Sequence, residues 1–141
     1  GEARDVAAAQ AARAKELKAA GRRAALISGG ELTVTIAGNG RGGPNQEFAL
    51  ALAIALAGEP GIVALSGDTD GTDGGGGKAT DPAGAIIDET TLARARALGL
   101  VPAQSLAQND STGFFSALGD LLQTGPTLTN VNDCRVILIE P

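Results

Sequence analysis

The stretch GRGGPNQEFALALAIALAG, residues 40–58, decides the fold of this chain. Its large apolar residues alternate with alanine, which matches the period of a strand. Alanine, however, is a strong helix former and a poor strand former. The run also lies between Pro44 and Gly58, which suit the first turn and the end of a helix. We therefore predict a helix that is apolar on all sides and hence buried.

Helices and strands are predicted to alternate on both sides of this buried helix. The other predicted helices are 2–20, 91–98, one turn at 105–108, and 114–118, and the predicted strands are 22–27, 32–36, 62–65, 83–87, 121–124 and 135–139. Such alternation predicts the α/β class, as a single layered domain with a mixed β-sheet flanked by helices. We expect residues 1–21 to form an N-terminal helix that links to another domain, and residues 22–141 to form the folded unit.

Composition excludes several classes of function. The chain has 141 residues, which suits one compact domain, and 43% of them are hydrophobic, which argues against disorder. There is no histidine and one cysteine, Cys134, so the chain offers no Ser-His-Asp triad, no His-ligated zinc and no internal disulfide. The remaining side chains, mostly carboxylates, basic groups, hydroxyls and amides, suit phosphate and magnesium.

Charge and hydropathy narrow the partners further. A net charge of −5 and three aromatic residues, all phenylalanine, argue against a nucleic-acid surface. The longest apolar run is far shorter than the roughly 20 residues that a membrane span needs. We therefore expect a protein that binds neither nucleic acid nor membrane. The single cysteine gives secretion no support, so we expect a cytoplasmic location, and a homodimer is compatible with the sequence.

The glycine-rich segment 40–47 is the first candidate site. Glycines let the backbone come close to a ligand, and a helix N-terminus offers free N–H groups with a partial positive charge. The guanidinium of Arg41 can contact a phosphoryl group with two parallel hydrogen bonds. This pattern predicts Arg41 as a catalytic residue, with Gly42, Gly43 and Asn45 binding phosphate. A flexible loop with a solvated arginine and Asn45 as a helix cap explains the segment equally well.

The segment 68–74 is the second candidate site, because it places three carboxylates within six residues. Carboxylate oxygens suit Mg²⁺ or Ca²⁺, although the spacing fits no EF-hand. We predict Asp70 and Asp73 as metal ligands. The alternative is a surface loop whose aspartates make Asx turns and whose glycines supply positive φ angles.

The segment 125–133 is rich in short hydrogen-bonding side chains. Thr129, Asn130 and Asn132 are predicted to bind phosphate or substrate hydroxyls, although a polar connection between two strands is an equally good interpretation.

A short motif that occurs twice in the chain gives two more candidate residues. Residues 25–29 and 64–67 each run a short apolar strand into a Ser-Gly turn. Ligands of open α/β sheets lie beyond the carboxyl ends of strands, so Ser28 and Gly29 are predicted to contact substrate or phosphate. In a chain so rich in leucine and alanine, coincidence is an equally good explanation of this repeated motif.

Taken in order, these segments resemble the MOFRL domain, the C-terminal part of the type-2 glycerate kinases. The resemblance extends from about Ala24 to the end of the chain. Each motif is weak alone, but the ordered set is specific. The motifs are Ser28–Glu31, Gly40–Gly43 with Asn45–Glu47, Thr69–Gly74, Thr80-Asp81 with Ala83–Ala85, Asn109–Ser111, and Gly125–Thr127 with Thr129–Asp133.

The resemblance implies a kinase that uses ATP and Mg²⁺ to phosphorylate D-glycerate. It also implies a Rossmann-like N-terminal domain, absent from this chain, with the active site in the cleft between the two domains. In that setting Arg41 would stabilise the transferring phosphoryl group, and the isolated chain would be inactive. Some relatives carry the name hydroxypyruvate reductase, but no dinucleotide fingerprint is present. The alternative is a stand-alone module that binds small anions or nucleotides without catalysis.

Overall fold

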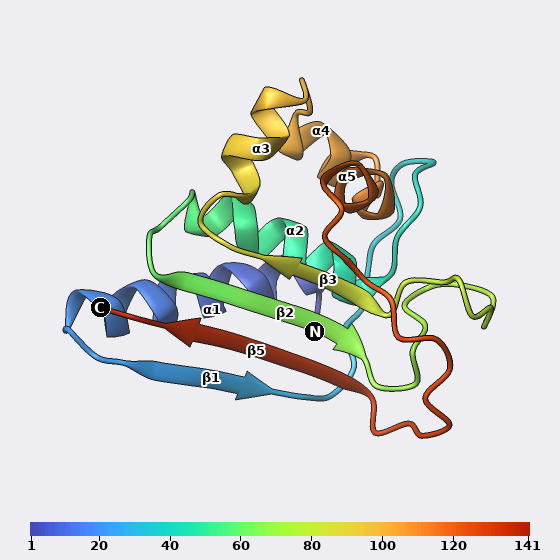
Figure 1. Cartoon of the computed structure of the whole chain (residues 1–141), viewed down its shortest axis with the longest axis horizontal. Helices are drawn as coiled ribbons and strands as arrows, with labels where there is room; N and C mark the ends of the chain where they lie inside the picture. The colour runs from blue at the N-terminus through green and yellow to red at the C-terminus, as the bar shows by residue number, and fades with distance from the viewer.

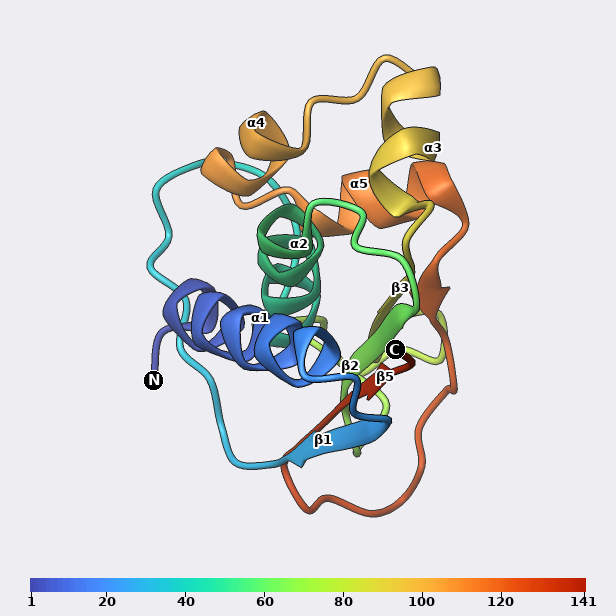
Figure 2. The same cartoon turned by 90° about the vertical axis from the view of Figure 1, so that its left-hand side faces the viewer.

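The computed structural model describes residues 1–141, and it forms one five-stranded sheet with helices packed on one of its faces (Figures 1 and 2). The strand order across the sheet is β1-β5-β2-β3-β4. The elements are α1 (Ala3–Ala19), β1 (Ala24–Ser28), α2 (Pro44–Leu56), β2 (Ile62–Asp68), β3 (Gly84–Ile87), α3 (Thr91–Ala97), α4 (Pro102–Ala107), α5 (Ser111–Leu118), β4 (Leu121–Leu122) and β5 (Asp133–Ile139). No helix is both long enough and apolar enough to cross a bilayer. The α/β class and the single layered domain are confirmed.

The ambiguous alanine-rich run forms helix α2, as predicted, and it is the centre of the core. Ten of its thirteen residues are buried, so its lack of a polar face matches its position, where it contacts α1, the strands β2 and β3, and the helices α3, α4 and α5. Pro44 is the first helical residue. The helix ends where Ala57 and Gly58 take positive φ angles of 57° and 75°. This left-handed stop is typical of helix C-termini, although here alanine takes the position that glycine usually fills.

Helix α1 belongs to the same core, and its role as a link to another domain stays a prediction. Its buried residues recur every three or four positions and form one face, four alanines followed by a leucine: Ala3, Ala7, Ala11, Ala14 and Leu17. Small side chains allow the two helices to pack closely over this face. At the far end of the pair, Lys15 Nζ donates to Ala55 O at 2.7 Å.

The sheet is antiparallel at every strand pair, whereas the sequence predicted a mixed sheet. Strands β1 and β2 do run in the same direction, as the arrows of Figure 1 show. They do not pair, because β5 lies between them and runs against both. The last strand of the chain thus inserts between β1 and β2, which the alternation of elements along the sequence does not reveal.

The predicted strand at residues 32–36 is wrong. Only an isolated bridge forms there, between Thr33 and Glu2. The first residues of the chain take up the backbone groups of this segment: Ala3 N donates to Thr33 O at 2.9 Å, and Thr35 N donates to a carboxylate oxygen of Glu2 at 3.0 Å. The segment therefore pairs with the start of α1 and adds no strand to the sheet.

Candidate functional site

Three loops rich in glycine, aspartate or threonine meet at one end of the sheet, the end where β1 and β2 finish and β5 begins (Figure 1). They are residues 37–43, residues 69–83 and residues 123–132. The segments that the sequence singled out therefore share one end of the molecule, here called the loop end. Their contacts decide which side chains face solvent there and which are used to hold the fold.

The loop end is built over a buried polar cluster at the start of α2. Asn45, Gln46 and Glu47 are each at most 2% exposed. Asn45 Nδ2 donates to Asp133 Oδ1 at 2.7 Å, and Asn45 Oδ1 accepts from Ser66 Oγ at 2.6 Å. Buried polar groups need such partners, since an unpaired one loses its hydration without compensation. Asn45 therefore joins α2 to the central strands.

A buried ion pair completes the sheet side of this cluster. Arg135 Nη1 lies 2.8 Å from Asp133 Oδ2, and both side chains are only 4% exposed. The guanidinium also donates to Ser28 Oγ at 3.2 Å and to Gly29 O, and it stacks over the Phe48 ring at 5.6 Å from the centroid. These contacts compensate the positive charge of Arg135 and the negative charge of Asp133, which would otherwise be costly to bury.

The serines of the two Ser-Gly turns flank this arginine in the sheet, and Ser28 bonds to it directly. In the register of the sheet, Ser28 and Ser66 lie opposite Arg135 from its two sides. Ser28 Oγ also accepts from Gln10 Nε2 at 3.0 Å. Ser28 and Gly29, which were predicted to contact a ligand, therefore use their oxygens inside the domain.

Glu47 and Asn109 hold the other side of the cluster. Arg4 Nε lies 2.7 Å from one oxygen of Glu47, and Asn109 Nδ2 donates to the other oxygen at 3.0 Å. Asn109 Oδ1 accepts from the N–H groups of Ala37 and Gly38 at 2.8 and 2.9 Å. The loop before α2 is thereby fixed to both α2 and the segment that leads into α5.

Asp73 lies at the N-terminus of α2, and its carboxylate is bonded to the first residues of that helix. Oδ1 accepts from the backbone N–H of Asn45 at 2.9 Å, and Oδ2 accepts from that of Gln46 at 2.8 Å. The side-chain amides of the same two residues donate to the carboxylate at 3.2 and 2.9 Å. Asp73 is 4% exposed, and burial raises its pKa, an effect that these hydrogen bonds from Asn45 and Gln46 partly oppose.

Asp70 has different neighbours. Its Oδ1 accepts from Thr72 N at 2.8 Å, and its Oδ2 accepts from Asn130 Nδ2 at 3.5 Å. The pKa of the adjacent Asp68 is raised, first by burial and also by the negative charge of Asp70. No three His, Cys, Asp or Glu side chains are arranged to hold a metal ion. A Mg²⁺ held jointly by Asp70 and Asp73 does not fit this arrangement, because the oxygens of Asp73 are taken by N–H donors.

The loop that carries Arg41 is held in place by α5. Arg41 N donates to Asp110 Oδ1 at 3.1 Å, and Thr112 N donates to Arg41 O at 2.8 Å. A Cβ added at Gly40 would lie 2.6 Å from the Asp110 Cα, and one added at Gly42 would meet the Ser111 hydroxyl. The glycines therefore permit close packing of this loop on α5, where the sequence had suggested flexibility or approach to a ligand.

The Arg41 side chain faces a polar hollow of about 290 Å³. Arg41 is exposed and makes no ion pair. The N–H groups of Gly42, Gly74 and Gly75 have no partner in the chain. The hollow has no hydrophobic residue in its wall, which is formed by Gly40, Arg41, Gly42, Asp73, Gly74, Gly75, Asp81, Pro82 and Thr112. Free donors beside an unpaired guanidinium can accommodate an anion.

The third loop presents its side chains to solvent. Thr129, Asn130 and Asn132 are all exposed. The backbone is fixed, because Thr69 N and Thr69 Oγ1 donate to Asn132 O at 3.1 and 2.8 Å, and Asn132 N donates to Asn130 Oδ1 at 2.9 Å. The side chains of Thr129 and Asn132 therefore remain available for a ligand.

Sequence reasoning missed the roles of two residues, Thr112 in the wall of the hollow and Asp133 in the buried polar cluster. Thr112 lines the hollow and donates from Oγ1 to Gln46 Oε1 at 2.7 Å. Asp133 accepts from Asn45, Arg135 and Leu32 N. Asp110 does cap α5, as expected for Asn109–Ser111, and that cap was the signal that could have placed Thr112 in the first turn of α5.

Comparison with known proteins agrees with this architecture. Residues 24–133 match the MOFRL family. A crystal structure of a glycerate kinase from Thermotoga maritima superposes with a TM-score of 0.91 at 48% identity, over 98% of this chain and 33% of that chain. A D-glycerate 2-kinase from Thermotoga maritima is 52% identical over 116 residues, which cover 82% of this chain and 27% of that protein.

A protein from Agrobacterium vitis that carries a hydroxypyruvate reductase name is 51% identical over 146 residues, which cover 99% of this chain and 37% of that protein. The chain thus spans about a third of the length of these relatives. The matched residues contain every loop of the site described above. The resemblance read from the sequence is therefore confirmed, and this chain belongs to the MOFRL family.

Proposed function

We propose that this chain provides one wall of the active site of a glycerate kinase, an enzyme that transfers a phosphoryl group from ATP to glycerate. The relatives with kinase names support this reaction class. A Rossmann-like partner domain, of the kind that the resemblance implies, would supply the main nucleotide contacts and the general base. Without that domain the wall described here is open to solvent, so we expect the isolated chain to be inactive.

One observation carries the proposal: Arg41 is a free cation on a fixed loop beside free N–H groups. The loop is anchored at Arg41 N and Arg41 O, and the guanidinium still has no carboxylate partner. Phosphoryl transfer is catalysed mainly by positioning and by stabilising charge on the transferring group. A preorganised arginine with neighbouring N–H donors supplies both, because little reorganisation is needed as charge develops.

The remaining residues have supporting roles in this proposal. The backbone of Gly42 and Gly43 lies beside Arg41, and their N–H groups can donate to phosphate oxygens. Thr129, Asn130 and Asn132 are exposed at the loop end, where they can orient the hydroxyls of glycerate or of the nucleotide. Asn45 has an indirect role, because its side chain is buried and holds the start of α2 in place through its bond to Asp133.

ATP and Mg²⁺ enter this proposal from the family resemblance. The pair Asp70 and Asp73 does not fit a shared metal ion, so no catalytic step is assigned to a cation at that pair. The need for ATP and the lack of a second cysteine favour the cytoplasm as the compartment.

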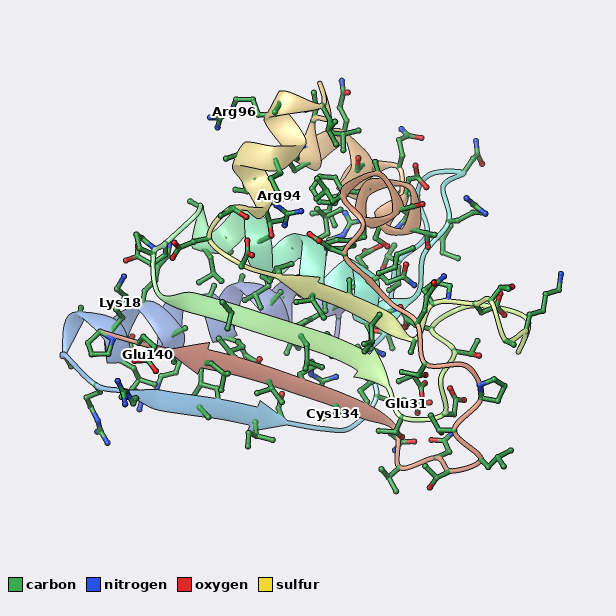
Figure 3. All side chains as sticks on the ribbon, viewed as in Figure 1. Lys18, Glu31, Arg94, Arg96, Cys134 and Glu140 are labelled. Atoms are coloured by element: carbon green, nitrogen blue, oxygen red, sulfur yellow. The ribbon has the colours of Figure 1, made fainter.

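The proposal is tested by replacing Arg41 with alanine in the active protein and measuring turnover with ATP and glycerate. We expect kcat to fall at least ~100-fold, as for the loss of a transition-state contact. The matched control is Arg96→Ala, because Arg96 is an exposed arginine on α3 that projects away from the loop end (Figure 3). A fall of less than threefold for Arg41→Ala would rule out the assigned role.

Calorimetry of the isolated chain separates the kinase from the alternative of a small-anion or nucleotide module. A module would bind ATP–Mg²⁺ or glycerate tightly by itself, and Arg41→Ala would abolish that binding. The kinase proposal predicts weak or no binding until a partner domain is present, since half of the contacts are then missing.

A further inference from the structure

The start of α2 already holds an anion, and that anion belongs to the protein. Asp73 accepts two backbone N–H groups and two side-chain amides there, all within 3.2 Å. We infer that Asp73 is a positioning residue, whose carboxylate fills the anion position at the N-terminus of α2 and thereby fixes the loop that carries Arg41. This inference rests on the proposed function only where it concerns turnover.

The hydrogen bonds of Asp73 fill its capacity. A carboxylate offers about four lone-pair positions, and four N–H donors occupy them here. The side chain makes no ion pair with Lys or Arg, so the balancing positive charge is the partial charge at the N-terminus of α2. The position is thus built for a small anion, and a cation would face four N–H groups.

Asp73 influences the position of Arg41 because the backbone of residues 73–74 packs against that of residues 42–43. A Cβ added at Gly74 would lie 2.7 Å from Gly43 Cα, and one added at Gly43 would lie 2.5 Å from Asp73 O. The segment 73–74 therefore presses directly on residues 42–43, next to Arg41. On its other side, Arg41 is held by Asp110 and Thr112. Removing the Asp73 carboxylate frees one of these two supports.

The test is chemical rescue in this chain, measured as thermal stability. Asp73→Ala leaves a space the size of a carboxylate opposite the same N–H donors. We expect a fall in Tm of at least about 5 °C. Sodium formate should restore at least half of that loss, whereas sodium chloride at the same ionic strength should not. The matched control is Asp81→Ala, on the same loop, for which formate should have no more effect than chloride.

The result that would overturn the inference is an Asp73→Ala protein whose Tm lies within 1 °C of the original, or one that responds equally to formate and chloride. If Asp73→Ala does not fold, Asp73→Asn gives the answer. Its amide keeps one acceptor and turns an N–H toward the helix donors, so its Tm should also fall. A metal-ligand role predicts instead that Mg²⁺ raises the Tm of the original protein and that Asp73→Asn abolishes this rise.

Turnover distinguishes failure of this inference from failure of the kinase proposal. In the active protein, Asp73→Ala should lower kcat more than it changes KM, and formate should restore kcat. Formate should not restore Arg41→Ala. If formate restores the Tm of Asp73→Ala while Arg41→Ala remains fully active, the result supports the positioning role of Asp73 and rules out the catalytic role of Arg41. If formate restores neither Tm nor kcat, the positioning role itself is wrong.

Discussion

Replacing Gly43 by alanine should destabilise the protein strongly, although its φ of −112° is open to any residue. The new Cβ would lie 2.5 Å from the carbonyl oxygen of Asp73, whereas ordinary contacts begin at 3.4 Å. The backbone at residue 73 would have to retreat by about 1 Å, which also moves its carboxylate away from the start of α2. Overpacking and a weakened helix cap together should cost about 3 kcal/mol, or about 10 °C in Tm.

Urea denaturation of Gly43→Ala and Gly76→Ala measures this effect against a matched control. Gly76 lies on the neighbouring loop, its φ is not positive, and an added Cβ would meet nothing within 4 Å. Gly76→Ala should therefore be neutral or slightly stabilising, since alanine restricts the unfolded chain. If Gly43→Ala lies within 0.5 kcal/mol of the original protein, the two loops do not press on each other as described.

Three further changes probe other parts of the structure. Arg135→Met should cost about 3–5 kcal/mol in urea denaturation, because it leaves the buried carboxylate of Asp133 without its charged partner; a loss below 1 kcal/mol would contradict this. Ala7→Leu should cost about 1–3 kcal/mol by overpacking the contact between α1 and α2, whereas Ala8→Leu, on the exposed side, should cost almost nothing. Asp88→Asn should destabilise more at pH 7 than at pH 3, because the hydrogen bonds from Thr90, opposed by burial, lower the pKa of Asp88. The stability from a lowered carboxyl pKa is present above its ordinary value near 3.9 and is lost as the pH falls through the folded value; an equal loss at both pH values would refute this assignment.

The elements with strong local signals could be predicted from the sequence. Helix α2 followed from alanine content and from its flanking proline and glycine, even though its apolar period suggested a strand. Residues 32–36 show the limit of such reasoning. Their alternation is typical of a strand, but the backbone groups of Thr33 and Thr35 are taken by the first residues of the chain, a contact across about thirty residues of sequence.

The candidate site shows the same limit for function. Asp70 and Asp73 are three residues apart, and nothing in their spacing distinguishes a pair of metal ligands from two separate roles. In the folded chain Asp73 turns into the start of α2, while Asp70 faces residues 127–130. Arg41 could be proposed from the sequence because its chemistry depends on one side chain alone, and its role stays a prediction. The role of Asp73 depends on which helix lies beside it, and only the fold determines that.

The glycines around Arg41 have a consequence for the energetics of recognition. A loop of this composition is usually expected to lose much conformational freedom when it clasps a ligand. Here its neighbours already confine it, so that loss occurs when the chain folds, and little remains to oppose complex formation. Affinity at this wall should then depend mainly on how well a ligand matches a rigid template, and poorly matched anions should be rejected because the template cannot adapt to them.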